Sequence, residues 1–160
     1  MIEDFQHVSI TCRDIERSIN FYQRLGLRVI KRTAEVSEDG IAKAFQLPAG
    51  HLMVAYLAAP DDKSTMFIDL VQWLTPESTG DAYRALNQVG INRIAFRVSD
   101  IDSTTASLRG QGISFLSEEP QRIGEGIRSI VTTDPDGVFI QLIEGLEASS
   151  RKPVGRLINS

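Results

Sequence analysis

The sequence contains an internal repeat, and this repeat constrains the fold more than any other feature of the chain. His7 aligns with Arg93 at an offset of 86 residues (93 − 7), while the closing segment 67–72 aligns with 139–144 at an offset of 72 (139 − 67). The second copy is therefore shorter than the first by 14 residues (86 − 72). The residues without a counterpart match the polar stretch 35–50, which we expect to be a long loop in the first copy.

Both copies show the same order of periodicities, an alternating strand, a helical pattern and then three more strands. Asp14 is placed to cap the first helix and Gly26 to end it. In the first copy we expect strands at 5–12, 27–33, 51–58 and 66–74, with the helix between the first two. In the second copy we expect strands at 91–98, 113–116, 127–133 and 138–144, with a helix at 100–110.

This order predicts an α+β fold in which two tandem βαβββ modules form curved mixed sheets around a concave pocket. We expect a single domain over 1–160. Its parts are module 1 at about 5–74, a linker at 75–90, module 2 at about 91–144 and a C-terminal tail at 145–160.

Alternation along the predicted strands decides which side chains face the concave surface. Cys12 falls on the opposite face, against the helix, where we expect an inert thiol. The aromatic side chains of the concave face form either an apolar wall for a ligand or part of the core, and for Trp73 a subunit interface is the preferred alternative. The predicted lining consists of His7, Asp69, Arg93 and Gln141, with Arg97, Phe67, Trp73 and Phe139 beside them.

Composition and charge argue against several classes of protein. The chain has 17 basic and 21 acidic residues, and its net charge of −4 argues against a nucleic-acid partner. It contains no apolar run long enough to span a membrane, and its N-terminus lacks the layout of a signal peptide. A single cysteine excludes an internal disulfide and a cysteine-rich metal site. We therefore expect a cytoplasmic protein without nucleic-acid or membrane partners.

The chain resembles the vicinal oxygen chelate superfamily, which includes glyoxalases, bleomycin-resistance proteins and extradiol dioxygenases. The resemblance rests on HVSI and DIERSINFYQRLGL at 7–10 and 14–27, and on RIAFRV and DPDGVFIQLIE at 93–98 and 134–144. It implies a homodimer with a small-molecule ligand. Because the superfamily includes lyases, isomerases, dioxygenases and binding proteins, the fold alone does not decide the reaction.

The resemblance also implies a set of metal-ligand positions. The metal enzymes of the family use a His, a Glu or Gln, a second His and a Glu, which fall here on His7, Asp69, Arg93 and Gln141. Arg93 departs from this pattern, because a guanidinium has only hydrogen-bond donors and stays protonated. Glu144 alternates to the face opposite Gln141 and does not replace the missing carboxylate. We therefore expect no conventional divalent metal centre; if a metal binds, its ligands are His7, Asp69 and Gln141.

Two interpretations of Arg93 remain open and are compatible. It forms an ion pair with Asp69 at the vacated metal position, or it binds a carboxylate, phosphate or enolate oxygen of a ligand. The residues favour a glyoxalase-like isomerase or lyase that transfers a proton next to a carbonyl of a small oxygenated molecule, without a divalent metal. His7 is the expected acid and base, Arg93 the anchor for negative charge, and Asp69 and Gln141 orient them.

The expected ligand is anionic or contains a carbonyl group. Two alternatives stay beside this hypothesis. One is a metal-dependent enzyme resembling lactoylglutathione lyase or a dioxygenase, and the other is a resistance-type protein that binds a small molecule without chemistry.

Overall fold

The computed structural model describes residues 1–60 and 66–146 of the chain. The contacts of the chain divide it into two units, each holding one copy of the repeat. The first unit is Met1–Arg84 together with Asp134–Val138, and the second is Ala85–Thr133 with the chain from Phe139 onward. The boundary between them falls inside the expected linker. Most of the expected C-terminal tail lies outside the described residues.

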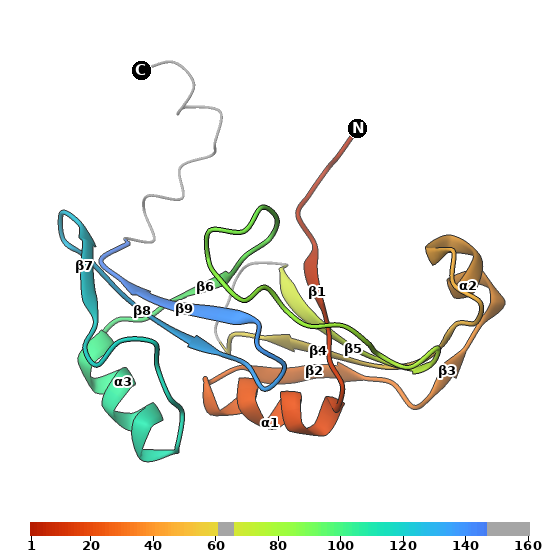
Figure 1. Cartoon of the computed structure of the whole chain (residues 1–160), viewed down its shortest axis with the longest axis horizontal. Helices are drawn as coiled ribbons and strands as arrows, with labels where there is room; N and C mark the ends of the chain where they lie inside the picture. The colour runs from red at the N-terminus through yellow and green to blue at the C-terminus, as the bar shows by residue number, and fades with distance from the viewer. Residues whose placement is uncertain (61–65, 147–160) are drawn as a thin grey trace. The chain divides into compact units, whose positions relative to one another are not determined.

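The first unit is a mixed sheet with strand order β1-β5-β4-β2, in which β3 pairs with β4. Strands β1 and β5 are parallel, and the other pairs are antiparallel. Helix α1 packs along the sheet, while α2 lies beyond its end, next to β3 (Figure 1). The elements are β1 (His7–Thr11), α1 (Ile15–Arg24), β2 (Arg28–Arg32), β3 (Val36–Ser37), α2 (Asp39–Phe45), β4 (His51–Ala58) and β5 (Phe67–Thr75).

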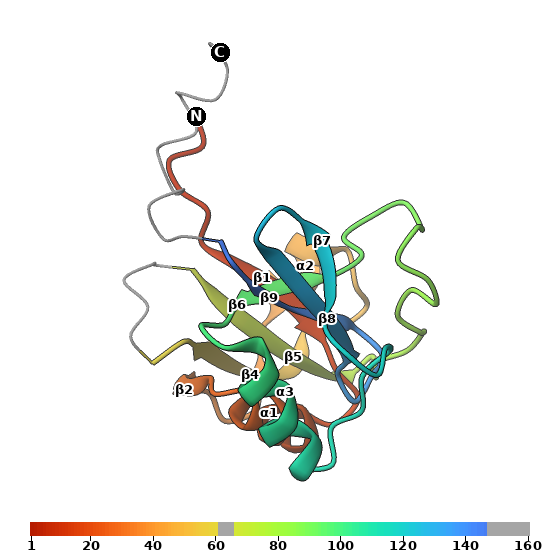
Figure 2. The ribbon, with the colours of Figure 1, turned by 90° about the vertical axis from the view of Figure 1, so that its left-hand side faces the viewer.

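The second unit is a mixed sheet with strand order β6-β9-β8-β7 and one helix. Strands β6 and β9 are parallel, and β7 and β8 form the hairpin seen in Figure 2. The expected fold class is thereby confirmed, since the protein is α+β with two mixed sheets built from βαβββ modules. The elements are β6 (Ile94–Arg97), α3 (Ile101–Gly110), β7 (Gln121–Gly124), β8 (Ile127–Thr133) and β9 (Phe139–Glu144).

The helices of the two copies begin in the same way. The Asp14 side chain accepts a hydrogen bond of 3.0 Å from the backbone N–H of Arg17, and the Asp100 side chain accepts one of 2.9 Å from that of Ser103. Each aspartate therefore satisfies one of the N–H groups that a helix start leaves without a partner. Gly26 follows the end of α1 at a φ of +98°, a conformation that glycine adopts without strain.

The expectation of a long loop at 35–50 is wrong. The segment forms the short strand β3 and the seven-residue helix α2, which ends at Gln46 in a left-handed conformation with φ +55°. None of the residues of α2 is buried. The helix therefore packs no face into the core, and at seven residues it is too short for its periodicity to be recognised in the sequence.

The expected strand at 113–116 is also wrong. Its described pairing with β8 consists of an isolated bridge between Phe115 and Thr132 and a 2.8 Å hydrogen bond from the N–H of Leu116 to the carbonyl of Val131. The third strand of the sheet is instead β7, which pairs with β8 at Gln121–Gly124, in a segment whose sequence shows no strong alternation. Pairing with a long neighbouring strand, rather than an apolar pattern of its own, makes this segment a strand.

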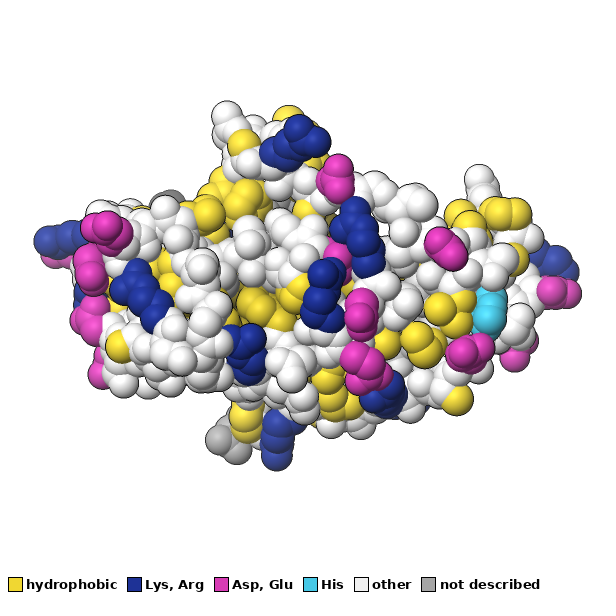
Figure 3. All heavy atoms as spheres, turned by 60° about the horizontal axis from the view of Figure 1, so that its bottom comes forward, with side chains coloured by type: hydrophobic (Ala, Val, Ile, Leu, Met, Phe, Trp, Pro, Cys, Tyr) yellow, Lys and Arg dark blue, Asp and Glu magenta, His cyan; other side chains and the backbone are white. Residues whose placement is uncertain are grey.

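Charged side chains of both signs are distributed over the surface. On the face shown in Figure 3, basic and acidic groups lie among one another rather than in a patch of one sign. Among the described residues, no helix combines the length and the apolar character needed to cross a bilayer.

Candidate functional site

His7, Ser9, Phe67 and Asp69 lie together because β1 and β5 run parallel in a fixed register. His7 pairs with Phe67 and Ser9 with Asp69, so that each pair is adjacent on the same face of the sheet. The His7 ring stacks on the Phe67 ring with centroids 5.2 Å apart and planes inclined by 26°. The Ser9 hydroxyl donates a 2.8 Å hydrogen bond to Asp69 Oδ2. The register therefore positions both an imidazole and a carboxylate.

The two oxygens of the Asp69 carboxylate differ in their surroundings. His7 Nε2 lies 4.0 Å from Oδ2, which is beyond hydrogen-bond distance, and the side chains of His7 and Asp69 are 41% and 14% exposed. The other oxygen, Oδ1, is buried and has no hydrogen-bond partner among the described residues. Buried polar atoms are nearly always paired, so an open acceptor at this position is the kind of group that a ligand donor or a proton satisfies.

Aromatic rings continue this face toward β4 and β2. Tyr56 pairs in register with Asp69, and its ring lies 4.6 Å from the Phe67 ring between centroids. Lys31 pairs with Tyr56, and its Nζ lies 5.4 Å from the centroid of the Tyr56 ring. Sequence reasoning did not place Tyr56 and Lys31 in the site, because their position depends on the register across three strands. We call the cluster of His7, Ser9, Tyr56, Phe67 and Asp69 the first-sheet site.

The equivalent positions of the second unit hold a different cluster. Arg93 Nε donates a 2.9 Å hydrogen bond to Gln141 Oε1, and Arg93 Nη1 donates one of 3.1 Å to Asn92 Oδ1. Gln141 Nε2 donates a 2.7 Å hydrogen bond to Ser129 Oγ. Arg93 is exposed, whereas Gln141 is only 8% exposed. We call Asn92, Arg93, Ser129 and Gln141 the second-sheet cluster.

The convergence of His7 and Asp69 with Arg93 and Gln141 concerns both units and stays a prediction. The same holds for an ion pair between Arg93 and Asp69.

The four positions that the resemblance assigns to metal ligands hold different kinds of side chain in the two units. In the first unit His7 and Asp69 offer two ligating side chains. In the second, the Arg93 guanidinium has no lone pair, and the Gln141 oxygen already accepts a hydrogen bond from it. Among the described residues, no group of three or more His, Cys, Asp or Glu side chains is placed to hold a metal ion.

Glu144 points away from Gln141, as alternation predicts. Its Oε1 accepts a 3.1 Å hydrogen bond from the backbone N–H of Ile101 at the start of α3. Gln72 has the equivalent contact in the first unit, where its Oε1 accepts a 2.9 Å hydrogen bond from the N–H of Ile15. Both side chains therefore serve a helix terminus.

The remaining predicted residues have separate environments. Trp73 packs edge-on against Phe45 of α2, with ring centroids 6.1 Å apart, and Phe139 is buried at 8% exposure. Arg97 is exposed on β6. Cys12 is buried, and this burial raises the pKa of its thiol to about 11, which makes it a poor nucleophile at neutral pH.

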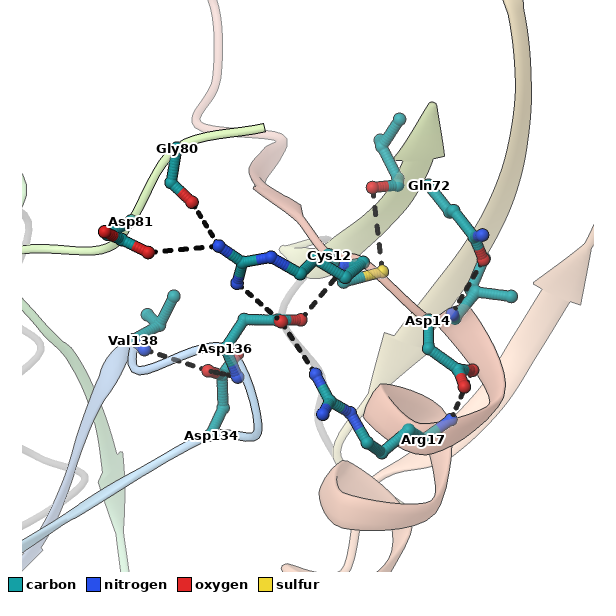
Figure 4. A network of polar contacts seen from close by, with 12 residues as sticks. Cys12, Asp14, Arg17, Gln72, Gly80, Asp81, Asp134, Asp136 and Val138 are labelled. Atoms are coloured by element: carbon teal, nitrogen blue, oxygen red, sulfur yellow. Dashed lines mark hydrogen bonds and ion pairs between the residues drawn. The ribbon is translucent and has the colours of Figure 1, made fainter. Parts of the chain in front are cut away.

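The turn at Asp134–Val138 belongs to the first unit and forms a polar network there (Figure 4). Asp134 Oδ1 accepts hydrogen bonds of 2.9 and 2.8 Å from the N–H groups of Asp136 and Val138, and Oδ2 accepts one of 3.0 Å from the Tyr22 hydroxyl. Asp136 Oδ1 pairs with Arg13 at 3.1 Å and Arg17 at 2.7 Å. The sequence predicts this turn but not its contacts with α1.

Comparison with known proteins identifies relatives that match most of this chain. A lactoylglutathione lyase from Haemophilus influenzae is 30% identical over 148 residues, covering 90% of this chain and 94% of that protein. A lactoylglutathione lyase from Schizosaccharomyces pombe is 24% identical over 148 residues, and the match covers 88% of this chain but only 44% of the yeast protein. The chain thus spans less than half of that relative.

A solved structure and a family match agree with these relatives. The crystal structure of a glyoxalase family protein from Bacillus cereus superimposes with a TM-score of 0.80 at 26% identity, covering 92% of this chain and 97% of the other. Residues 4–142 match the family described as Glyoxalase/Bleomycin resistance protein/Dioxygenase superfamily. The fold, the repeat and this match together show that the chain belongs to the glyoxalase/bleomycin resistance protein/dioxygenase superfamily.

Proposed function

We propose that the protein is a glyoxalase-like enzyme, of isomerase or lyase type, that moves a proton next to a carbonyl group of a small oxygenated molecule. The observation that carries this proposal is the proximity of His7 to Asp69 in the first-sheet site. A partly exposed imidazole lies 4.0 Å from a carboxylate whose second oxygen is buried and open. The relatives named lactoylglutathione lyase support the reaction class, because a lactoyl thioester carries a hydrogen next to its carbonyl.

His7 acts as general base and then as general acid. Its neutral ring removes the proton from the carbon next to the carbonyl, and the electron pair moves onto the carbonyl oxygen to give an enolate. The imidazolium then returns the proton to a neighbouring atom, so that no oxidant or reductant is needed. Asp69 stabilises the imidazolium by its negative charge, and stacking on Phe67 holds the ring in place.

The open oxygen of Asp69 has a role of its own in this proposal. Oδ1 accepts a hydrogen bond from a hydroxyl group of the bound molecule, which replaces the partner that the buried oxygen lacks. Ser9 holds the carboxylate in the required rotamer through its hydrogen bond to Oδ2. The preferred ligand therefore carries a hydroxyl group beside its carbonyl.

Arg93 of the second unit is proposed as a cation that binds an anionic oxygen. The chemistry proceeds without a conventional divalent metal, because the residues at the family's ligand positions provide an arginine where a metal needs a lone pair.

Exchange of the hydrogen next to a carbonyl with solvent deuterium tests the proposal. Chelator-treated protein is incubated in D2O with lactoylglutathione or hydroxyacetone, and loss of that proton signal is followed by NMR. We expect the wild-type protein to accelerate exchange of at least one compound, and His7→Ala to slow it by about 100-fold or more. His51→Ala is the matched control, since His51 pairs with Glu35 away from this site and its variant should keep the wild-type rate.

Three results would overturn the proposal. Exchange that is equally fast in His7→Ala contradicts the role of His7. Exchange that appears only after a divalent metal is added favours the metal-dependent alternative. Ligand that binds and is recovered without exchange favours a binding protein.

A further inference from the structure

The two copies of the repeat carry side chains of different charge at equivalent positions. His7 and Asp69 of the first unit correspond to Arg93 and Gln141 of the second. The first pair offers a base and a carboxylate, whereas the second offers a fixed cation beside a neutral amide. A group that the second pair binds must therefore be anionic.

Some N–H donors of the Arg93 guanidinium form hydrogen bonds within the protein, and the others do not. A guanidinium has five N–H donors. Gln141 Oε1 takes the Nε donor, and Asn92 Oδ1 takes one donor of Nη1. Nη2 has no hydrogen-bond partner among the described residues, and Nη1 keeps its second N–H, so both terminal nitrogens retain donors for the oxygens of an anion.

Ser129 holds the far end of the Gln141 amide. Because a guanidinium only donates, the amide presents its oxygen to Arg93 Nε, and its Nε2 then donates a hydrogen bond to the hydroxyl of Ser129, which is 5% exposed. A buried amide with both ends paired has one orientation. The chain from Ser129 through Gln141 thereby fixes the plane of the guanidinium before any ligand arrives, which lowers the entropy cost of binding.

Arg97 is a second arginine that can be compared with Arg93. It lies on the same strand, two residues beyond Ala95 and four beyond Arg93, so that alternation places it on the same face. It is exposed, and no hydrogen bond holds its guanidinium within the described part of the chain. The two arginines therefore carry the same charge but differ in how they are held.

We propose that the second unit contains an oxyanion-binding site, in which Arg93 binds a carboxylate or phosphate group through Nη1 and Nη2, and Gln141 and Ser129 are positioning residues. This inference deepens the proposed function, on whose assignment of Arg93 to an anionic oxygen it rests. It names the class of substrate, a molecule with a carboxylate or phosphate group, and two residues that act through Arg93.

Titration of the full chain with inorganic phosphate and, separately, with acetate tests the site. The signal of the Arg93 Nε–H in ¹⁵N-labelled protein, assigned by its absence in Arg93→Lys, is followed at constant ionic strength. We expect a saturable shift with at least one ion, and the two titrations decide whether phosphate or carboxylate is preferred. Affinity measured by calorimetry should fall about tenfold in Arg93→Lys, which loses the paired donors, and should stay within about twofold in Arg97→Lys.

Variants of Gln141 distinguish the effect of its hydrogen bonds on the position of Arg93 from the effect of charge at residue 141. Gln141→Met keeps the size of the side chain but removes both hydrogen bonds, so the Nε–H signal should broaden and phosphate affinity fall by about three- to tenfold. Gln141→Glu keeps an acceptor for Nε and adds a negative charge, so the signal should stay sharp while phosphate binding weakens. Ser129→Ala should weaken binding by a smaller factor, because Gln141 Nε2 then loses its acceptor while its oxygen still pairs with Arg93. Thermal unfolding of each variant checks that it is folded.

The site is excluded if neither ion gives a saturable shift in the wild-type protein, or if Arg97→Lys weakens binding as much as Arg93→Lys. The positioning role is excluded if folded Gln141→Met binds phosphate like the wild type. Ion binding needs no turnover, so a failure here and a failure of the deuterium exchange assay are separate results.

Discussion

At the scale of single residues, Asp134 shows how burial and hydrogen bonding oppose each other. Burial raises the pKa of its carboxyl, although two backbone N–H groups and the Tyr22 hydroxyl bind its oxygens. Because the folded state then holds the proton more tightly than the unfolded state, the associated stability is present below the ordinary value of 3.8 and is lost as the pH rises through the raised pKa. At neutral pH the charge of Asp134 is therefore a cost.

We predict that Asp134→Asn is more stable than Asp134→Ala at neutral pH, because the amide oxygen still accepts from both N–H groups without a buried charge, and only the Tyr22 hydroxyl loses its acceptor. The wild type should gain relative to Asp134→Asn as the pH falls through the raised pKa of Asp134, because the carboxyl then takes up a proton and the buried charge is lost. Asp134→Ala should lose about 1–3 kcal/mol, since it leaves buried donors unpaired. Denaturant unfolding at several pH values measures both. An asparagine variant as unstable as the alanine variant would contradict this account.

At the scale of elements, the same side-chain contact occurs at the first N–H group of a helix in both units. The alignment of the two copies does not reveal it. Gln72 and Glu144 are equivalent in the repeat, and each side chain accepts a hydrogen bond from the first N–H group of the helix in its own unit. An uncharged and a charged side chain thus perform one task, for which an oxygen acceptor suffices, and the second oxygen of Glu144 lies 3.7 Å from Arg128 Nη1 at the partly exposed surface.

Glu144→Gln should therefore cost little stability, and Glu144→Leu should cost about 1–3 kcal/mol, because it leaves the N–H of Ile101 without its acceptor. Gln72→Glu and Gln72→Leu should behave in the same way in the first unit. Chemical denaturation of the four variants provides the comparison. The account fails if the leucine variants are as stable as their conservative partners.

The elements also show how far sequence reasoning reaches. Strand β4 lies at 51–58 as expected, because its apolar run is bounded by clear turn signals. Helix α2 was missed because no face of it is buried, and β7 because pairing with β8 rather than its own pattern defines it. In the site, alternation placed His7 on the face opposite the buried Cys12, but Tyr56 and Lys31 required the register between strands.

At the scale of the whole molecule, duplication supplied two equivalent sheet faces whose residues then diverged. One face has an imidazole and a carboxylate, and the other has a guanidinium held by an amide. The family membership is shown, whereas the homodimer that the resemblance implies stays a prediction. The central claim is that this residue set supports proton transfer without a divalent metal ion.

Metal content per chain tests that claim most directly. Protein is purified without chelator, loaded with nickel, zinc, manganese or iron(II), desalted and measured by elemental analysis beside His7→Ala. We predict far less than one ion per chain under every loading, with no difference between wild type and variant. Retention of nearly one ion per wild-type chain, lost in His7→Ala, would contradict the account and assign His7 to a metal centre.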